Sequence, residues 1–283
     1  MGEATNQGRK VTARDILILR ALARYYLLGK SQLKSLVFPD HQGLSSAGKY
    51  LRRLEEKGLV VRLKGKGETG YLLSQAGRTL LGQNGKEAFV LLRPKDLPLM
   101  QAITTVRLQL EADLNCHPVI GLQRFVVRFE QKRSQKGGNH QAFCLSDQVT
   151  HPSTGQEMEV FPDALMIFRH KSEGAQEQRL GFLVFDRGRK QDTFLEMVSS
   201  YRLYSESGKY RKYGRFDSFR VFLIVRSLRR ADQIIRLLSH LKGSHLFRIT
   251  TLEEIHDGSL TFDPIWRDAE KKTHRLVRKG PLK

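Results

Sequence analysis

The chain has 283 residues, 40% of them hydrophobic, and this length predicts two domains that each bury their own core. Its formal net charge of +20 at pH 7 predicts a polyanionic partner, most simply nucleic acid. No apolar run reaches the ~20 residues of a membrane span, which excludes a membrane-spanning protein, and the N-terminal residues lack a signal-peptide core, which argues against secretion. The two isolated cysteines form no CxxC motif, so neither a cysteine zinc site nor a disulfide framework is indicated. We therefore expect a cytoplasmic protein with no membrane partner.

Three helical patterns fill most of the first predicted domain, residues 1–82. Thr12 has the character of an N-cap for a helix over 13–26, and Ser31 can cap a short second helix. The third helix, 44–57, repeats apolar residues at spacings of three and four, so one face is buried and the other is polar and basic.

A hairpin pattern follows the third helix. Two apolar runs at 59–61 and 71–73 flank a basic, glycine-rich tip at 64–70, and residues 74–81 suggest a closing helix. Three helices followed by such a hairpin resemble a winged helix-turn-helix module, whose third helix enters the major groove while its wing contacts the backbone. The alternative, a helical bundle with an ordinary solvated basic face, stays open.

The winged-helix interpretation predicts contacts with double-stranded DNA that need no cofactor. We expect the third helix to contact the bases and the wing to contact the phosphates. The predicted DNA-binding residues of this domain are Ser45, Ser46, Lys49, Arg52 and Arg53 in the helix, and Arg62, Lys64 and Lys66 in the wing.

A linker over 83–98, a second domain over 99–266 and a basic tail over 267–283 complete the predicted organisation. The second domain alternates strands with helices, which predicts an α/β domain. Its expected strands are 125–130, 160–168, 180–185, 219–225 and 246–250, and its expected helices are 99–114, 191–207 and 229–242.

Two carboxylates, Asp163 and Asp186, stand at the ends of neighbouring predicted strands. A metal-dependent nuclease holds Mg²⁺ with carboxylates so placed, and the ion activates water. Asp163 and Asp186 are therefore the candidate metal ligands and catalytic residues, and Glu111 on the helix 99–114 is a third candidate. In the alternative structural interpretation, Asp163 is a turn residue and Asp186 pairs with Arg187 or Arg189.

The segments PDALMIF (162–168) and FLVFDRG (182–188), together with the winged-helix pattern and the final FDPIW (262–266), resemble the replication-relaxation family of plasmids and mobile elements. More widely, they resemble the PD-(D/E)xK restriction-endonuclease-like superfamily. The resemblance implies an α+β winged helix-turn-helix followed by a restriction-endonuclease-like α/β domain. It also implies a sequence-specific DNA-binding protein acting in replication, mobilisation or their regulation.

The resemblance is incomplete at the nuclease motif. Val184 stands where the family has a glutamate, and Asp186 stands where the wider superfamily has its lysine. A valine cannot hold a metal, so we expect an inactive nuclease-like domain. The alternative is a metal-dependent DNA nickase that uses Asp163 and Asp186 with Mg²⁺. A pure interaction module is a third hypothesis.

A cluster of tyrosines and basic residues follows the helix 191–207. We expect Tyr201 and Tyr204 to pack against the sheet. Lys209, Arg211 and Lys212 are expected to form an exposed basic patch that contacts DNA phosphates. The sequence leaves open whether the chain forms a homodimer.

Overall fold

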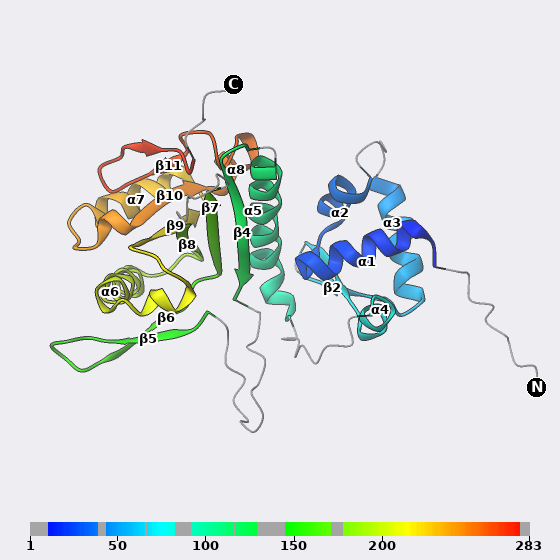
Figure 1. Cartoon of the computed structure of the whole chain (residues 1–283), viewed down its shortest axis with the longest axis horizontal. Coiled ribbons are helices and arrows are strands. Elements are labelled where there is room, and N and C mark those ends of the chain that lie inside the picture. The colour runs from blue at the N-terminus through cyan, green and yellow to red at the C-terminus, as the bar shows by residue number, and fades with distance from the viewer. Residues whose placement is uncertain are drawn as a thin grey trace, which may run out of the picture. The chain divides into compact units, whose positions relative to one another are not determined.

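The computed structural model describes residues 11–38, 44–65, 67–82, 92–115, 117–128, 145–170 and 178–277. These residues form two compact units (Figure 1). The first unit contains the described residues up to 82 together with 92–105, and the second contains the described residues from 106 onward. None of the described helices is both long and apolar enough to cross a membrane.

The helices of the first unit begin at identifiable caps. Thr12 and Asp15 form the expected capping box, in which the Thr12 hydroxyl accepts from the Asp15 amide (3.2 Å) and the Asp15 carboxylate accepts from the Thr12 amide (2.9 Å). The N-cap of the second helix is Gly29, not Ser31, and the Gln32 side chain accepts from the Gly29 amide. The helices are α1 (Ala13–Tyr25), α2 (Lys30–Val37), α3 (Leu44–Glu56) and α4 (Gln75–Leu80).

A three-stranded antiparallel sheet completes the first unit. It contains β1 (Leu27–Leu28), β2 (Val60–Lys64) and β3 (Thr69–Leu73), in the order β1-β3-β2. The hairpin β2–β3 matches the expected one, whereas β1 has too few residues to show a strand period. Helix α4 packs closely beneath the hairpin, since a Cβ on Gly77 would lie 2.3 Å from the Leu59 carbonyl oxygen.

Helix α5 (Leu97–Asn115) contributes its first turns to the first unit. Leu97 is fully buried, and the Thr104 hydroxyl donates to the Leu27 carbonyl (3.1 Å). A 3₁₀ turn, η1 (Pro94–Asp96), leads into this helix, so part of the predicted linker is regular structure. Pro98 is accommodated because the first helical turn needs no amide donor there.

The second unit is built on a mixed seven-stranded sheet in the described residues, with order β12-β11-β10-β9-β8-β7-β4. Strands β8, β9 and β10 are parallel to one another, and the remaining neighbours are antiparallel. The strands are β4 (Ile120–Val127), β7 (Ala164–His170), β8 (Gln178–Phe185), β9 (Phe219–Val225), β10 (Phe247–Thr251), β11 (Trp266–Arg267) and β12 (Thr273–His274).

Helices cover both faces of this sheet. Figure 1 shows α5 and α8 (Leu252–Asp257) on one side of the strands, and α6 (Gln191–Ser207) and α7 (Leu228–Leu238) on the other. The main core lies on the α6–α7 side, where alternate residues of four strands meet the two helices. Its members include Leu165, Phe182, Val184, Val221, Leu223, Phe194, Tyr201 and Ile234.

Two expectations for the second domain are wrong in detail. The apolar run 160–168 is two strands, β6 (Glu157–Val160) and β7, because Pro162 between them has no amide to donate to a ladder. Strand β6 pairs with β5 (Asp147–Thr150) in a separate hairpin. The predicted tail is also part of the fold up to residue 277, since β11 and β12 extend the sheet and Val277 is buried.

Candidate functional site

Helix α3 presents a basic surface opposite its buried face. Ala47, Leu51 and Leu54 are fully buried, whereas Lys49 and Arg52 are exposed. Ser46 is half-buried, and the Ser45 side chain lies outside the described part of the structure. Two cations of the predicted set are thus free to meet a ligand, and they lie on the same face of one helix.

Arg53 has a structural role, contrary to its assignment as a DNA contact. Its guanidinium lies 2.5 Å from the buried carboxylate of Asp15 and 4.7 Å above the Tyr50 ring. Burial alone would raise the pKa of Asp15, but the Thr12 hydrogen bonds and the Arg53 guanidinium together lower it. The pair therefore fastens α3 to α1.

The wing offers fewer free cations than its sequence suggests. Arg62 is paired with Glu55 of α3 (3.1 Å), with both side chains partly exposed. Lys64 is exposed at the end of β2, and Lys66 lies outside the described residues. Lys64 is accordingly the described wing residue best placed to meet a phosphate.

The basic segment after α6 anchors the β5–β6 hairpin. Lys209 Nζ donates to the Gln148 carbonyl (2.7 Å), and Lys212 Nζ lies 2.5 Å from the Asp147 carboxylate. The Tyr204 hydroxyl also donates to Asp147, and burial followed by this bond raises the pKa of Tyr204. Two of the three proposed phosphate contacts are thus already engaged by protein.

The remaining residues of this cluster differ in exposure, with the arginine at the surface and the tyrosines in the core. Arg211 is exposed, with its guanidinium carbon 5.7 Å from the Tyr210 ring centre. Tyr201 and Tyr204 are each 1% exposed, which confirms that they pack in the core.

Asp163 is buried where β4, β7 and β8 meet. Its backbone amide donates to the Leu183 carbonyl (2.8 Å), and its carboxylate accepts from the Phe185 amide (2.8 Å). The same carboxylate binds two guanidinium groups, those of Arg128 and Arg187, each at 2.6 Å. The carboxylate thus accepts hydrogen bonds from two cationic groups and one backbone amide, so its charge is compensated within the protein.

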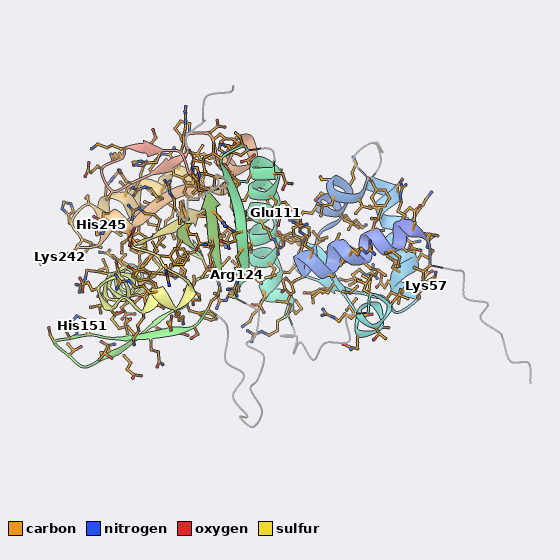
Figure 2. All side chains as sticks on the ribbon, viewed as in Figure 1. Lys57, Glu111, Arg124, His151, Lys242 and His245 are labelled. Atoms are coloured by element: carbon orange, nitrogen blue, oxygen red, sulfur yellow. The ribbon has the colours of Figure 1, made fainter. Side chains whose placement is uncertain are left out.

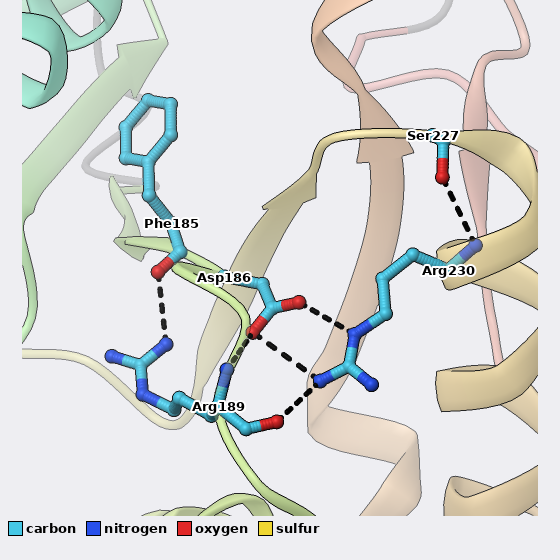
Figure 3. A network of polar contacts seen from close by, with 5 residues as sticks. All are labelled: Phe185, Asp186, Arg189, Ser227 and Arg230. Atoms are coloured by element: carbon cyan, nitrogen blue, oxygen red, sulfur yellow. Dashed lines mark hydrogen bonds and ion pairs between the residues drawn. The ribbon is translucent and has the colours of Figure 1, made fainter.

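Asp186 belongs to a second, separate network at the end of β8 (Figure 3). Arg230 on α7 donates to it at 2.6 Å, and the Arg189 amide donates at 3.2 Å. Arg230 also reaches the Arg189 carbonyl (2.9 Å), which closes the loop onto the helix. Gly188, at φ 78°, supplies the left-handed turn that this loop requires.

These contacts differ from the expected ones. The structural interpretation paired Asp186 with Arg187 or Arg189, and of these two Arg189 contacts it, through its backbone amide and not through an ion pair. Instead Arg187 crosses to Asp163, and the Arg189 side chain donates to the Phe185 carbonyl (2.8 Å). Sequence reasoning missed Arg128 and Arg230. The available signal was their position, since each follows closely after a strand that ends at this edge of the sheet.

Glu111 does not join the two aspartates. It lies on α5 (Figure 2) and pairs with Arg107 one turn earlier (3.0 Å). Asp163 instead lies near Tyr201 of α6, whose pKa is raised by burial and by that carboxylate. The described residues hold no group of three His, Cys, Asp or Glu side chains suited to a metal. With arginines on both aspartates, the donor set does not fit Mg²⁺.

An open pocket of about 520 Å³ lies beside these networks. Val184 and Tyr201 are among its buried lining residues, and Arg128, Arg187 and Arg189 line it as well. The Tyr201 hydroxyl is buried and has no hydrogen-bond partner in the described residues. The motif that carries the family resemblance therefore borders an open pocket, whose lining combines arginines with apolar side chains and with Glu157, Glu159 and Glu196.

No curated protein matches the chain. The family model described as Replication-relaxation matches residues 19–218, which is more than half of the chain and includes α3, the hairpin β2–β3 and both aspartates. The chain belongs to the replication-relaxation family.

Proposed function

We propose that this chain is a sequence-specific DNA-binding protein that acts in the replication, mobilisation or regulation of a plasmid or mobile element. The first unit acts as a winged helix-turn-helix, with α3 in the major groove and the hairpin β2–β3 against the backbone. The second unit is a nuclease-like domain without nuclease activity. Family membership supports the process, and the surface of α3 supports DNA as the ligand.

The observation that carries the proposal is the separation of the two faces of α3. Three apolar side chains of the helix are fully buried, while Lys49 and Arg52 project from the exposed face. An arginine so placed can donate two hydrogen bonds to a guanine, which is the commonest specific contact in the major groove. The net charge of +20 adds a sequence-independent attraction to the phosphates.

The test begins with selection of a preferred duplex from random DNA, followed by fluorescence anisotropy at fixed salt. Arg52→Ala should weaken binding to the selected duplex by about 1–3 kcal/mol, which is roughly 5- to 150-fold, and should relax preference at one base position. Arg20→Ala is the matched control, since Arg20 is an exposed arginine of α1. Equal losses for both variants, or no selected duplex, would overturn the proposal.

The wing has a different signature from the helix. Lys64→Ala should weaken binding to all sequences alike and reduce the slope of log K against log salt by about one. An unchanged slope would show that Lys64 does not contact a phosphate, and the wing would then need another role. A selected site with two-fold symmetry, bound at twice the chain mass, would add a homodimer to the proposal.

The absence of nuclease activity is proposed from the donor set, because each aspartate is held by guanidinium groups. The corresponding test is nicking of supercoiled plasmid with Mg²⁺ and then Mn²⁺, using the wild type and Asp163→Asn. We expect binding without nicking. Metal-dependent nicking that disappears in the variant would establish the nickase alternative, with Asp163 and Asp186 as ligands.

A further inference from the structure

A second cavity, of about 410 Å³, opens at the other end of the parallel strands from the two aspartates. Four arginines line it, namely Arg179, Arg220, Arg248 and Arg275. Asp163 precedes β7 and Asp186 follows β8, so both lie at the opposite edge of the sheet. This cavity shares no lining residue with the pocket beside them.

Strand register explains why the arginines converge. Arg220 lies opposite Gly181 on β8, and Arg248 lies opposite Phe222 on β9. Arg179 precedes Gly181 by two residues, so three adjacent strands direct an arginine to the same face of the sheet. Gly181 lets the Phe222 ring pack closely on this face of β8, because a Cβ there would meet that ring at 2.8 Å.

The positive charge of this cavity is poorly compensated. Arg220 and Arg248 hydrogen bond only to backbone carbonyls in the described residues, at 3.1 Å for Arg220 to Phe219 and at 2.7 Å for Arg248 to Phe247. Neither has a carboxylate partner there. Burial lowers the pKa of Arg248, and the positive charge of nearby Arg220 lowers it further.

The acidic groups described nearby do not pair with Arg220 or Arg248. Asp217 is the only carboxylate in the described lining, and it is exposed. Asp268 acts on Arg248 from a distance but is itself held by His274 (2.6 Å) and by the amides of Glu270 and Lys272. The cavity therefore has donors in excess of acceptors, a composition that suits an anion with several oxygens.

We propose that this cavity binds a phosphate group, with Arg220 and Arg248 as its principal ligands. Guanidinium groups match phosphate oxygens in pairs, and two of them facing one cavity favour a multiply charged tetrahedral anion over a single carboxylate. The phosphate comes either from a DNA backbone or from a free phosphoanion. The first source rests on the proposed DNA-binding function, and the second does not.

Trp266 makes the site directly observable. It is the only tryptophan of the chain, it lines the cavity, and its ring packs on Phe222 at 4.9 Å between centres. The full chain would be titrated with pyrophosphate, with inorganic phosphate and with a duplex oligonucleotide, following tryptophan fluorescence and, in parallel, heat of binding by calorimetry.

The variant Arg220→Gln/Arg248→Gln is compared with Arg229→Gln/Arg236→Gln, which removes the same charge from exposed positions of α7. We expect saturable binding by the wild type and the control, and at least tenfold weaker binding by the cavity variant at unchanged thermal stability. Equal binding by both variants, or no heat and no fluorescence change with any ligand, would overturn the proposal.

The two sources are separated by which ligand competes. If the duplex saturates the site and the cavity variant lowers the salt slope of DNA binding, the phosphate is that of DNA. If only pyrophosphate or phosphate saturates it, the ligand is a free phosphoanion. Repeating the titration in Arg52→Ala distinguishes the two proposals, because a failure of base reading by α3 leaves the pyrophosphate response intact.

Discussion

The substitution Asp163→Ala separates a structural role for this carboxylate from a catalytic one. In the structure, Asp163 is 1% exposed and accepts hydrogen bonds from the Phe185 amide, Arg128 and Arg187. If these contacts hold the strands together, their removal must destabilise the second unit. A carboxylate reserved for a metal would contribute little to stability and could be removed at small cost.

The magnitude follows from the exposure of each partner. The Phe185 amide would lose its acceptor in a buried position, which costs about 1–3 kcal/mol. Arg128 is 19% exposed, so losing its partner resembles the breaking of a buried pair, at ~3–5 kcal/mol. Arg187 is 44% exposed, and water screens its contribution to about 0–1 kcal/mol. Because these terms overlap, we expect a total loss of roughly 3–5 kcal/mol.

Chemical denaturation followed by tryptophan fluorescence is the appropriate assay. The only tryptophan, Trp266, belongs to the second unit, so its transition reports on the unit that contains Asp163. Asp163→Asn should recover about 1–3 kcal/mol of this loss, because an amide oxygen still accepts from the Phe185 amide but forms no ion pair with Arg128. A loss below about 1 kcal/mol for Asp163→Ala would refute the structural role. Such a small loss would mean that the arginine contacts do not require the carboxylate, and a metal-binding role for Asp163 would then stand.

Two further expectations concern the first unit. Gly77→Ala should destabilise it by about 1–3 kcal/mol or more, since the new Cβ meets the Leu59 carbonyl oxygen at 2.3 Å. Gly48→Ala, inside α3, meets nothing closer than 3.8 Å and should stabilise the unit by roughly 0.5–1 kcal/mol. Thermal unfolding followed by circular dichroism should therefore show melting temperatures shifted in opposite directions. Folding lowers the pKa of Asp15, so its stabilisation is present above the unfolded pKa and is lost as pH falls through the folded one. Asp15→Asn should thus destabilise by about 1–3 kcal/mol at pH 7 and progressively less towards pH 3, and a difference independent of pH would contradict the ion pair with Arg53.

The spacing of apolar residues was sufficient to predict those helices and strands that are long enough to show a period of their own. Helices α1, α3, α6 and α7 and strand β9 lie close to where apolar spacing places them. Elements defined by a partner were not predictable in this way. Strands β1, β11 and β12 have two residues each, and a two-residue strand is specified by the ladder beside it rather than by its own pattern.

The same distinction applies to the site. The sequence placed Asp163 and Asp186 at neighbouring strand ends, which the structure shares. It could not indicate that Arg128, 35 positions away, would hold the first, or that Arg230, 44 positions away, would hold the second. Arg53 shows the converse, because its spacing suits the polar face of α3 while α1 supplies a buried carboxylate opposite it. Ion-pair partners are set by tertiary contact, which no local pattern contains.

The strand order of the second unit has a consequence for how the chain folds during synthesis. In the described residues, the sheet runs β4, β7, β8, β9, β10, β11 and β12 from one edge to the other, so each strand is laid beside the one made before it. Only the β5–β6 hairpin interrupts this succession. Pairing each strand with the sheet strand made just before it closes a shorter loop than pairing with any earlier strand would, which limits the entropic cost of each addition. We therefore expect the sheet to grow outward from β4 as the ribosome releases each strand.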